Sequence, residues 1–263
     1  MTDYPKVLVA APVYNKMEYC IKEFFDSVRN IDYPNYKILL VENSEGDEFF
    51  DKISGERRIK VVKYNSDEKV KMKRLIDSRN IILKYGVENN YDFILMMDCD
   101  VMPPSNIIGE LLNCHKDAVS GLYYNHFIVD NLKKWLPVCW KIFSDKEFDD
   151  IKTKYTLPEV IKSKEDMPRH ITPDEAGSGE LLEIFHPSAG CMLLSRKAFE
   201  NAKYHTEYKN GLLCTDDIPF VKNLRENGFK IYCYTKVLCK HLVEGKYEKD
   251  KDGNLVHPGR IDD

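Results

Sequence analysis

Two aspartates, Asp98 and Asp100, stand two residues apart directly after a short apolar run, with Cys99 between them. In extended backbone, residues two apart point to the same face, so both carboxylates face one side and Cys99 faces the other. Two close carboxylates repel each other unless a cation lies near them. A hard divalent ion, Mg2+ or Mn2+, prefers oxygen ligands and keeps positions that a diphosphate can fill. The spacing therefore indicates a metal site, and the alternative interpretation of so short a motif is a solvated turn.

Polar residues also follow two other predicted strands, and a second acidic pair begins a late predicted helix. The segments are Pro12-Val13-Tyr14-Asn15, Glu42-Asn43-Ser44 and Thr215-Asp216-Asp217. In open parallel sheets, ligands bind outside the carboxyl ends of the strands, so the residues at the strand ends are candidate ligand contacts. Asp216 and Asp217 also have a simpler interpretation, because acidic residues in the first turn of a helix interact favourably with its dipole.

The elements that must position these residues alternate between strands and helices over residues 1–125. Continuous apolar runs predict buried strands at 6–11, 37–42, 59–64, 92–97 and 118–124. Between them, apolar residues spaced by three and four predict a helix after a cap at Asn15, a helix at 48–53, one from 68 to a stop at Gly86, and one at 103–112. This alternation predicts an α/β fold: a doubly wound mixed sheet, mostly parallel, flanked by helices.

The second half of the chain is predicted to extend the same domain. Strands are expected at 181–185, 190–195 and 230–235, and helices at 196–201 and from a cap at Thr215 to Arg225. Between 146 and 180 the sequence is polar and punctuated by proline and glycine, which predicts an excursion from the fold. We expect a single domain at 1–245, with halves at 1–125 and 126–245, and a charged, loosely held tail at 246–263.

The composition argues against several classes of function. With 39 Lys+Arg against 43 Asp+Glu in 263 residues, the formal net charge of -4 provides no basic field for nucleic acid. The longest apolar stretches, at 7–14 and 93–97, are far shorter than the ~20 residues of a transmembrane helix, so no transmembrane segment is predicted. The eight cysteines contain no C-x-x-C pair, which favours reduced, mostly buried thiols. These features predict a cytoplasmic protein and leave association with a membrane surface open.

Taken together and in order, the motifs resemble those of GT-A-fold nucleotide-sugar glycosyltransferases, most closely the large inverting family 2. The matching segments are APVYN (11–15), VENSE (41–45), Asp77-Ser78-Arg79-Asn80, DCD (98–100), Ser188-Ala189-Gly190 with 191–199, and TDDIPFVKNLRENGFKIY (215–232). They resemble, in turn, the family's nucleotide loop, its acidic position at base and ribose, its helical "ARN" segment, its DXD metal motif, its acceptor-side segment and the stretch with the catalytic base. The resemblance implies a GT-A-like catalytic domain whose first half binds nucleotide and whose second half binds acceptor.

The resemblance also implies roles for individual residues. Nucleotide contacts are implied for Pro12, Tyr14, Asn15, Glu42, Asn43, Arg79 and Asp98, and metal ligands for Asp98, Asp100 and His241. Asp217 matches the catalytic base, and Asp216 beside it is the second candidate. The implied reaction moves a sugar from a UDP- or GDP-sugar to a hydroxyl of a glycan or lipid-linked glycan, with inversion and with Mn2+ or Mg2+ as cofactor. This chain has Asp216 where the family commonly has Glu, and Glu42 where it commonly has Asp.

Two other functions remain open from the sequence. A sugar-1-phosphate nucleotidyltransferase needs a glycine-rich phosphate loop after the first strand, and the segment APVYNK contains no glycine. An inactive, glycan-binding relative would keep the fold without turnover.

Several residues outside the main motifs have two interpretations. His241 is a metal ligand or a structural histidine, and His186 lines the acceptor site or the diphosphate unless it only supports a loop. Trp135 and Trp140 could stack on a sugar or pack in the core. The basic run Lys69, Lys71, Lys73 and Arg74 is most simply a solvated helix face. The polar excursion at 146–180 is predicted to act as a mobile cover over donor or acceptor.

Overall fold

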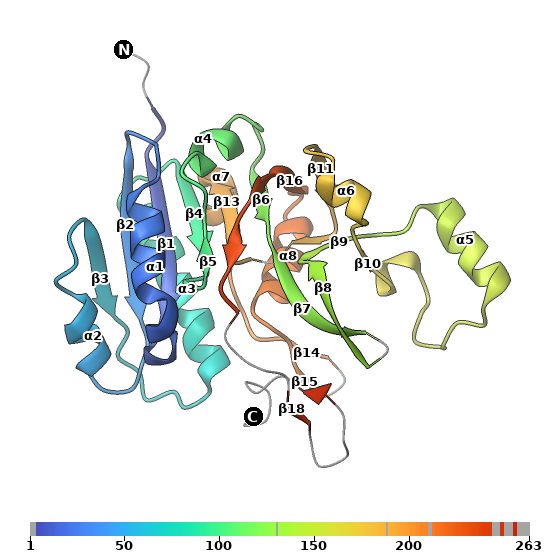
Figure 1. Ribbon diagram of the computed structural model, residues 1–263, viewed down its shortest axis with the longest axis horizontal. Coiled ribbons are helices and arrows are strands. Elements are labelled where there is room, and N and C mark those ends of the chain that lie inside the picture. Colours follow the sequence, from blue (N-terminus) through green and yellow to red (C-terminus); the bar gives the residue numbers. More distant parts are fainter. Residues whose placement is uncertain are drawn as a thin grey trace.

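An eight-stranded sheet forms the centre of the protein, with the strand order β11-β16-β6-β13-β4-β1-β2-β3 (Figure 1). The computed structural model describes residues 4–129, 131–187, 189–209, 212–243, 248–249 and 255–256. The strands are β1 (Val7–Val13), β2 (Tyr36–Glu42), β3 (Ile59–Lys63), β4 (Phe93–Met97), β6 (Ala118–Leu122), β11 (Leu181–Ile184), β13 (Cys191–Ser195) and β16 (Ile231–Leu238). Only β13 and β11 run against their neighbours among these strands. The prediction of a mixed, mostly parallel sheet is therefore confirmed.

Helices cover both faces of this sheet, and each face has its own core. The helices are α1 (Glu18–Arg29), α2 (Glu48–Ile53), α3 (Lys71–Glu88), α4 (Ile107–Leu112), α7 (Arg196–Glu200) and α8 (Asp217–Glu226). Strand β1 is buried along its whole length, with Val7 and Val9 packed toward Phe24 of α1, and Leu8 toward Ile82 of α3. The continuous apolar runs of the sequence are thus explained by burial on both faces of the sheet.

Three predicted helix ends differ from the structure. Helix α3 continues past Gly86, whose lack of a side chain lets α3 approach β4: a Cβ there would lie 2.5 Å from Ile94 Cδ1. Asn15 does not cap α1, because it belongs to a 3-10 turn at Asn15–Met17 that precedes the helix. Thr215 lies one residue too early to cap α8, whose N-cap position is Asp216.

The structure also contains short strands that the sequence did not predict. A hairpin of β7 (Tyr124–Val129) and β8 (Leu132–Pro137) follows β6, and β9 (Cys139–Lys141) pairs with β10 (Arg169–His170) and β12 (His186–Pro187). Two-residue strands also pair as β5 (Val101–Met102) with β17 (Lys240–His241), β14 (Tyr208–Lys209) with β15 (Leu212–Leu213), and β18 (Glu248–Lys249) with β19 (Leu255–Val256). Most of the predicted tail at 246–263 lies outside the described residues.

The predicted excursion at 146–180 contains two helices that differ in how they attach. Helix α6 (Pro173–Gly177) joins the core through Ala176, and Ile171 just before it is also buried. Helix α5 (Asp145–Lys154) projects at the outer edge of the molecule, far from the central sheet (Figure 1). Its start carries a capping box between Ser144 and Glu147, a pattern visible in the sequence.

The cysteines and the helices agree with two predictions from composition. All eight cysteines, which lie within the described residues, are free, and six of them are buried, which confirms the expectation of reduced thiols. Across the described ranges, no helix has the length and apolar character that crossing a bilayer requires.

Candidate active site

The Asp98–Asp100 motif lies at the carboxyl end of β4 and is held by its own backbone. The Asp98 N–H donates to the Gly190 carbonyl at 2.9 Å, and the Asp98 carbonyl accepts from the Val101 N–H at 3.0 Å. This turn separates β4 from β5 and presents the two carboxylates outside the sheet. The Asp98 side chain is 35% exposed and that of Asp100 is 20% exposed. The predicted juxtaposition of both acids at a strand end is therefore present.

His241 is brought to Asp100 by the pairing of β17 with β5, in which His241 lies opposite Val101. Its Nε2 lies 3.4 Å from Asp100 Oδ2, and its Nδ1 lies 2.9 Å from the carbonyl of Tyr124. Burial alone would lower the pKa of His241, but the Asp100 carboxylate and the Tyr124 carbonyl favour the protonated ring, so the pKa is raised. Asp100 and His241 thus form a carboxylate–imidazole pair.

Arg79 links the metal motif to the acidic pair at the start of α8. Its Nη2 lies 2.5 Å from Asp98 Oδ1, and its Nε forms an ion pair with Asp216. Arg79 is 2% exposed and Asp216 is 7% exposed. The centroid of the Tyr204 ring lies 5.4 Å from the guanidinium carbon of Arg79, so an aromatic face also covers the guanidinium. In this position Arg79 pairs with two carboxylates, and its contact with the nucleotide stays a prediction.

The pKa values of these two carboxyl groups are both raised. Burial is the main cause for Asp216, whose pKa rises to about 6; Arg79 opposes the rise, while Asp217 and Asp98 add to it. Burial also raises the pKa of Asp98, against the lowering effect of Arg79 and with a further increase from Asp100. Asp216 is thus buried and paired with Arg79, and its role as the second catalytic candidate stays a prediction.

Asp217 is the more accessible acid of the pair, with its side chain 21% exposed. Its Oδ2 lies 3.3 Å from His186 Nε2, and its Oδ1 accepts the Ile218 N–H at 3.0 Å. Burial would raise the pKa of Asp217, but His186 and Thr215 stabilise the carboxylate and the pKa is lowered. His186 is fixed in β12, and Arg225 of α8 donates to the preceding Phe185 carbonyl.

The predicted nucleotide side contains buried residues as well as exposed ones. Asn15 is exposed and its N–H donates to Ser44 Oγ at 2.8 Å, which joins the loops after β1 and β2. Glu42 is 0% exposed, and its two oxygens bind the Ser44 N–H at 2.7 Å and Lys63 Nζ at 2.6 Å. Glu42 therefore shapes the Ser44 loop, and its contact with the nucleotide stays a prediction.

Three further predicted contacts surround the same loops. Tyr14 is half-buried, and burial together with Cys99 and Asp100 raises the pKa of its phenol, which places Tyr14 near the acidic motif. Pro12 is buried within β1 beside Val41. Asn43 is 7% exposed, and its amide donates to Ser78 at 2.9 Å. Tyr14 and Asn15 are therefore the best placed of these residues to touch a ligand.

A match to a protein-family model identifies the family of this chain. Residues 8–202 match the model described as Glycosyl transferase family 2. The chain belongs to glycosyl transferase family 2. No curated protein matches its sequence.

Solved structures show that this family 2 chain has the GT-A fold. GalNAc-T7 with UDP, GalNAc and Mn2+ is similar with a TM-score of 0.59 at 14% identity, over 93% of this chain and 45% of that one. The mannosyltransferase PcManGT from Pyrobaculum calidifontis, with GDP-Man and Mn2+, has a TM-score of 0.53 at 16% identity, over 92% and 58%. S. aureus TarS 1–349 with UDP-GlcNAc has a TM-score of 0.51 at 15% identity, over 92% of this chain and 60% of that one. This chain therefore spans about half the length of these structures.

The donor set of the family 2 site fits a hard divalent ion. Because His241 Nδ1 lies within hydrogen-bond distance of a carbonyl, the neutral ring can carry its proton there and offer the Nε2 lone pair to an ion bound beside Asp100. One carboxylate and one imidazole leave further positions for phosphate oxygens and water, as in other sites for these ions. Within the described residues, no group of three or more His, Cys, Asp or Glu side chains is arranged to hold a metal by itself. The carboxylate of Asp98 forms an ion pair with Arg79.

One residue near these motifs carried no signal in the sequence. Tyr123 is 4% exposed, and the pKa of its hydroxyl is raised well above its ordinary value by burial and by Asp98, Asp100 and Asp217. A Cβ on Gly190, which stands in the predicted segment 188–190, would lie 2.6 Å from Asp98 Oδ2 and would also collide with the Tyr123 hydroxyl. Tyr123 therefore lies near the Asp98–Asp100 motif, and only glycine fits at position 190. Ser188, predicted in the same segment, lies outside the described residues.

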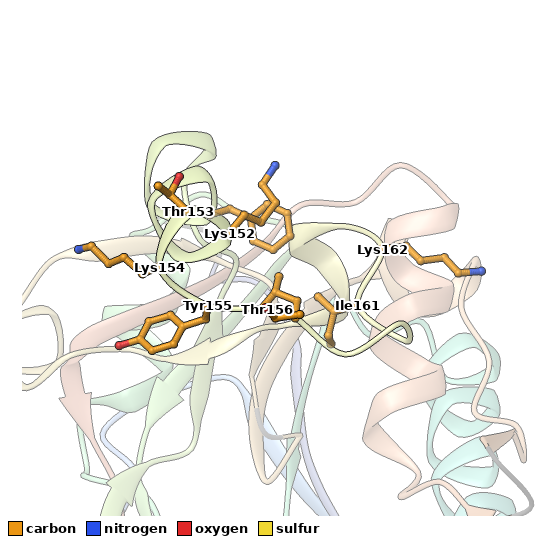
Figure 2. Close-up of a pocket in the computed structure, with 9 residues that line it drawn as sticks. Lys152, Thr153, Lys154, Tyr155, Thr156, Ile161 and Lys162 are labelled. Carbon is orange, nitrogen blue, oxygen red and sulfur yellow. The ribbon is translucent and has the colours of Figure 1, made fainter.

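A separate hollow of about 480 Å³ lies on the projecting part of the acceptor half (Figure 2). It is lined by 148, 152–157 and 161–162, none of which was predicted as a site residue. Figure 2 shows Lys154, Tyr155 and Lys162 pointing away from it. Its lining includes neither the Asp98–Asp100 motif nor Asp217, so the hollow is separate from the candidate site.

Proposed function

We propose that this chain is a metal-dependent glycosyltransferase that moves a sugar from a UDP- or GDP-sugar to a hydroxyl of a glycan or lipid-linked glycan. The observation that carries the proposal is the arrangement around Tyr123. Asp100 pairs with His241, whose ring lies 5.1 Å from the ring of this buried tyrosine, and the charges of Asp98, Asp100 and the partly exposed Asp217 all act on the tyrosine hydroxyl.

The metal side of this arrangement is assigned to Asp100 and His241, with Mn2+ or Mg2+ as the ion. When bound, such an ion supplies charge stabilisation for a departing diphosphate. The protein itself does not supply that charge: the cluster contains the carboxylates of Asp98, Asp100, Asp216 and Asp217, while Arg79 is already paired with two of them. An anionic donor would therefore be repelled without a cation. Mn2+ is present in the structures of GalNAc-T7 and PcManGT, which supports this assignment.

Asp217 is assigned as the base that takes the proton from the acceptor hydroxyl. His186 stabilises its carboxylate and keeps the pKa low, so Asp217 is ionised at neutral pH. We also assign inversion to the transfer, which the resemblance of residues 215–232 to the catalytic-base stretch of the inverting family supports. Tyr14 and Asn15 are assigned to the nucleotide, and Arg79 and Asp216 to positioning.

Two further properties complete the proposal. UDP, UDP-GlcNAc and GDP-Man occupy the similar structures, which supports a UDP- or GDP-sugar as donor. A cytoplasmic location is supported by the eight free thiols, because such thiols persist in reducing compartments.

The experiment measures release of UDP or GDP from a panel of nucleotide hexoses in the presence of Mn2+. Wild-type protein should release nucleotide from at least one donor. Asp217→Asn should lower the rate by roughly 10²–10⁴-fold, the usual contribution of a general base, and leave nucleotide affinity unchanged. Asp100→Ala should weaken nucleotide binding as well as turnover.

Asp150→Asn, a charge-matched change at an exposed position of α5, is the control and should alter neither quantity. Absence of release from every donor with wild-type protein would favour the inactive, glycan-binding relative. Near-normal turnover of Asp217→Asn would refute the base assignment.

A further inference from the structure

A second cavity, which we call the Trp135 pocket, lies directly behind the metal motif. It has a volume of about 340 Å³ and is lined by Tyr124, Trp135, Leu238, Cys239, Lys240 and His241. Small-molecule sites typically measure about 300–1,000 Å³, so the pocket is large enough for one small ring. It is formed where the β7–β8 hairpin meets the end of β16 and β17.

Trp135 presents a large apolar surface in this pocket and is held in place. Its side chain is 48% exposed, although its ring stacks on Tyr124 with a centroid distance of 6.1 Å and an angle of 13°. His126, its cross-strand partner, lies 4.5 Å away on the hairpin. Leu238 on the opposite wall is 56% exposed. The indole is thus fixed by its neighbours while much of its surface stays open to solvent, which is the condition for stacking a ligand.

The pocket is continuous with the proposed active site through two residues. His241 lines it and also faces Asp100, with 3.4 Å between Nε2 and Oδ2. Tyr124 lines it and accepts from the same histidine through its carbonyl. A molecule in the pocket therefore lies one side chain away from the metal position. The hairpin that carries Trp135 belongs to the half of the chain expected to bind acceptor.

The charged rim of the pocket distinguishes between possible occupants. Lys240 lines the pocket and forms an ion pair of 2.6 Å with Glu23, with both side chains more than half exposed. Together with the imidazole of His241, this pair offers hydrogen-bond donors and acceptors around an apolar floor. A pyranose ring has one apolar face and a rim of hydroxyls, so it matches both features, whereas an alkyl chain matches only the floor.

We propose that the Trp135 pocket binds one saccharide ring of the acceptor, stacked on the indole of Trp135. The inference rests on the proposed function, because it assigns the pocket to the acceptor of that reaction. In this arrangement Trp135 is a specificity residue that contacts the acceptor and makes no contact with the nucleotide.

The test uses fluorine NMR of protein labelled with 5-fluorotryptophan. The chain contains two tryptophans, Trp135 and Trp140, so two signals are expected, and Trp140→Phe assigns them. The probes are the methyl glycosides of glucose, galactose, mannose and N-acetylglucosamine, with octanol as the apolar comparison. At least one glycoside should shift the Trp135 signal in a saturable manner and leave that of Trp140 in place. Trp135→Ala should weaken binding of that glycoside by about fivefold in calorimetry, since stacking contributes on the order of 1 kcal/mol.

The result that overturns the proposal is a Trp135 signal that no glycoside moves, or one that moves only with octanol. A shift confined to Trp140 would also overturn it and would move the acceptor ring to the β9 strand. These measurements need neither donor nor turnover. Failure of the proposed function is recognised separately, by absence of nucleotide release from all donors.

Discussion

Replacing Asp216 by asparagine should change how the stability of this protein depends on pH. Asp216 is 7% exposed, is paired with Arg79 and faces Asp98 and Asp217. Burial raises its pKa from the ordinary value of 3.8 to about 6 despite the guanidinium. Between pH 3.8 and about 6, the folded protein therefore favours the neutral carboxyl group of Asp216, whereas the unfolded chain favours the carboxylate.

The size and sign of the effect follow from this pKa. One pKa unit corresponds to 1.36 kcal/mol, so ionising Asp216 costs the folded state about 3 kcal/mol relative to the unfolded chain. Below the unfolded pKa the group is protonated in both states and its contribution to stability is fully present. That contribution is lost as the pH rises from 3.8 through about 6. Asparagine resembles the neutral form at every pH, so the variant keeps this contribution to stability across the range.

The measurement is the free energy of unfolding by urea between pH 4 and pH 8 for wild type, Asp216→Asn and the exposed control Asp150→Asn. Relative to wild type, Asp216→Asn should gain up to about 3 kcal/mol across this range, and Asp150→Asn should change little. A difference that is constant with pH would refute the reasoning. A relative loss by Asp216→Asn at pH 8 would show that the Arg79 ion pair outweighs burial.

Two further predictions concern other parts of the acceptor half. Gly190→Ala should destabilise the fold by about 1–3 kcal/mol in urea unfolding and reduce turnover, because its Cβ would lie 2.6 Å from Asp98 Oδ2; wild-type stability and rate would contradict the close approach. Trypsin should cut the segment between Lys152 and Lys164, where Tyr155 is 66% exposed, and UDP with Mn2+ should slow the cut if 146–180 covers the site. Equal cleavage rates with and without nucleotide would refute the cover.

The central sheet could be predicted because its signal is local. Strands such as β1 and β4 are buried on both faces, so each is a continuous apolar run, and the predicted ends differ from the observed ones by at most two residues. The carboxyl end of β4 then locates Asp98 and Asp100 without further information. The hairpin β7–β8 could not be recognised in this way, since β8 is largely exposed and contains Lys133 and Lys134.

The partners within the site could not be predicted because they depend on contacts distant in sequence. Arg79 stands in a motif associated with the nucleotide, yet its burial against Asp216 follows from the packing of α3 beside α8 and Tyr204. Likewise, His241 reaches Asp100 through the two-residue pairing of β17 with β5, which is too short to leave a pattern. Tyr123 lies within the predicted strand 118–124 and belongs to no recognised motif.

The most direct test of the central claim is calorimetry of UDP and GDP binding with Mn2+ and with excess chelator. If Asp100 and His241 hold a divalent ion that carries the diphosphate, at least one nucleotide should bind in Mn2+ and bind at least about tenfold more weakly with chelator. His241→Ala and Asp100→Ala should each reproduce the chelator result in the presence of Mn2+. Affinity that is unchanged by chelator, or by both substitutions, would contradict a metal-dependent donor site at this position.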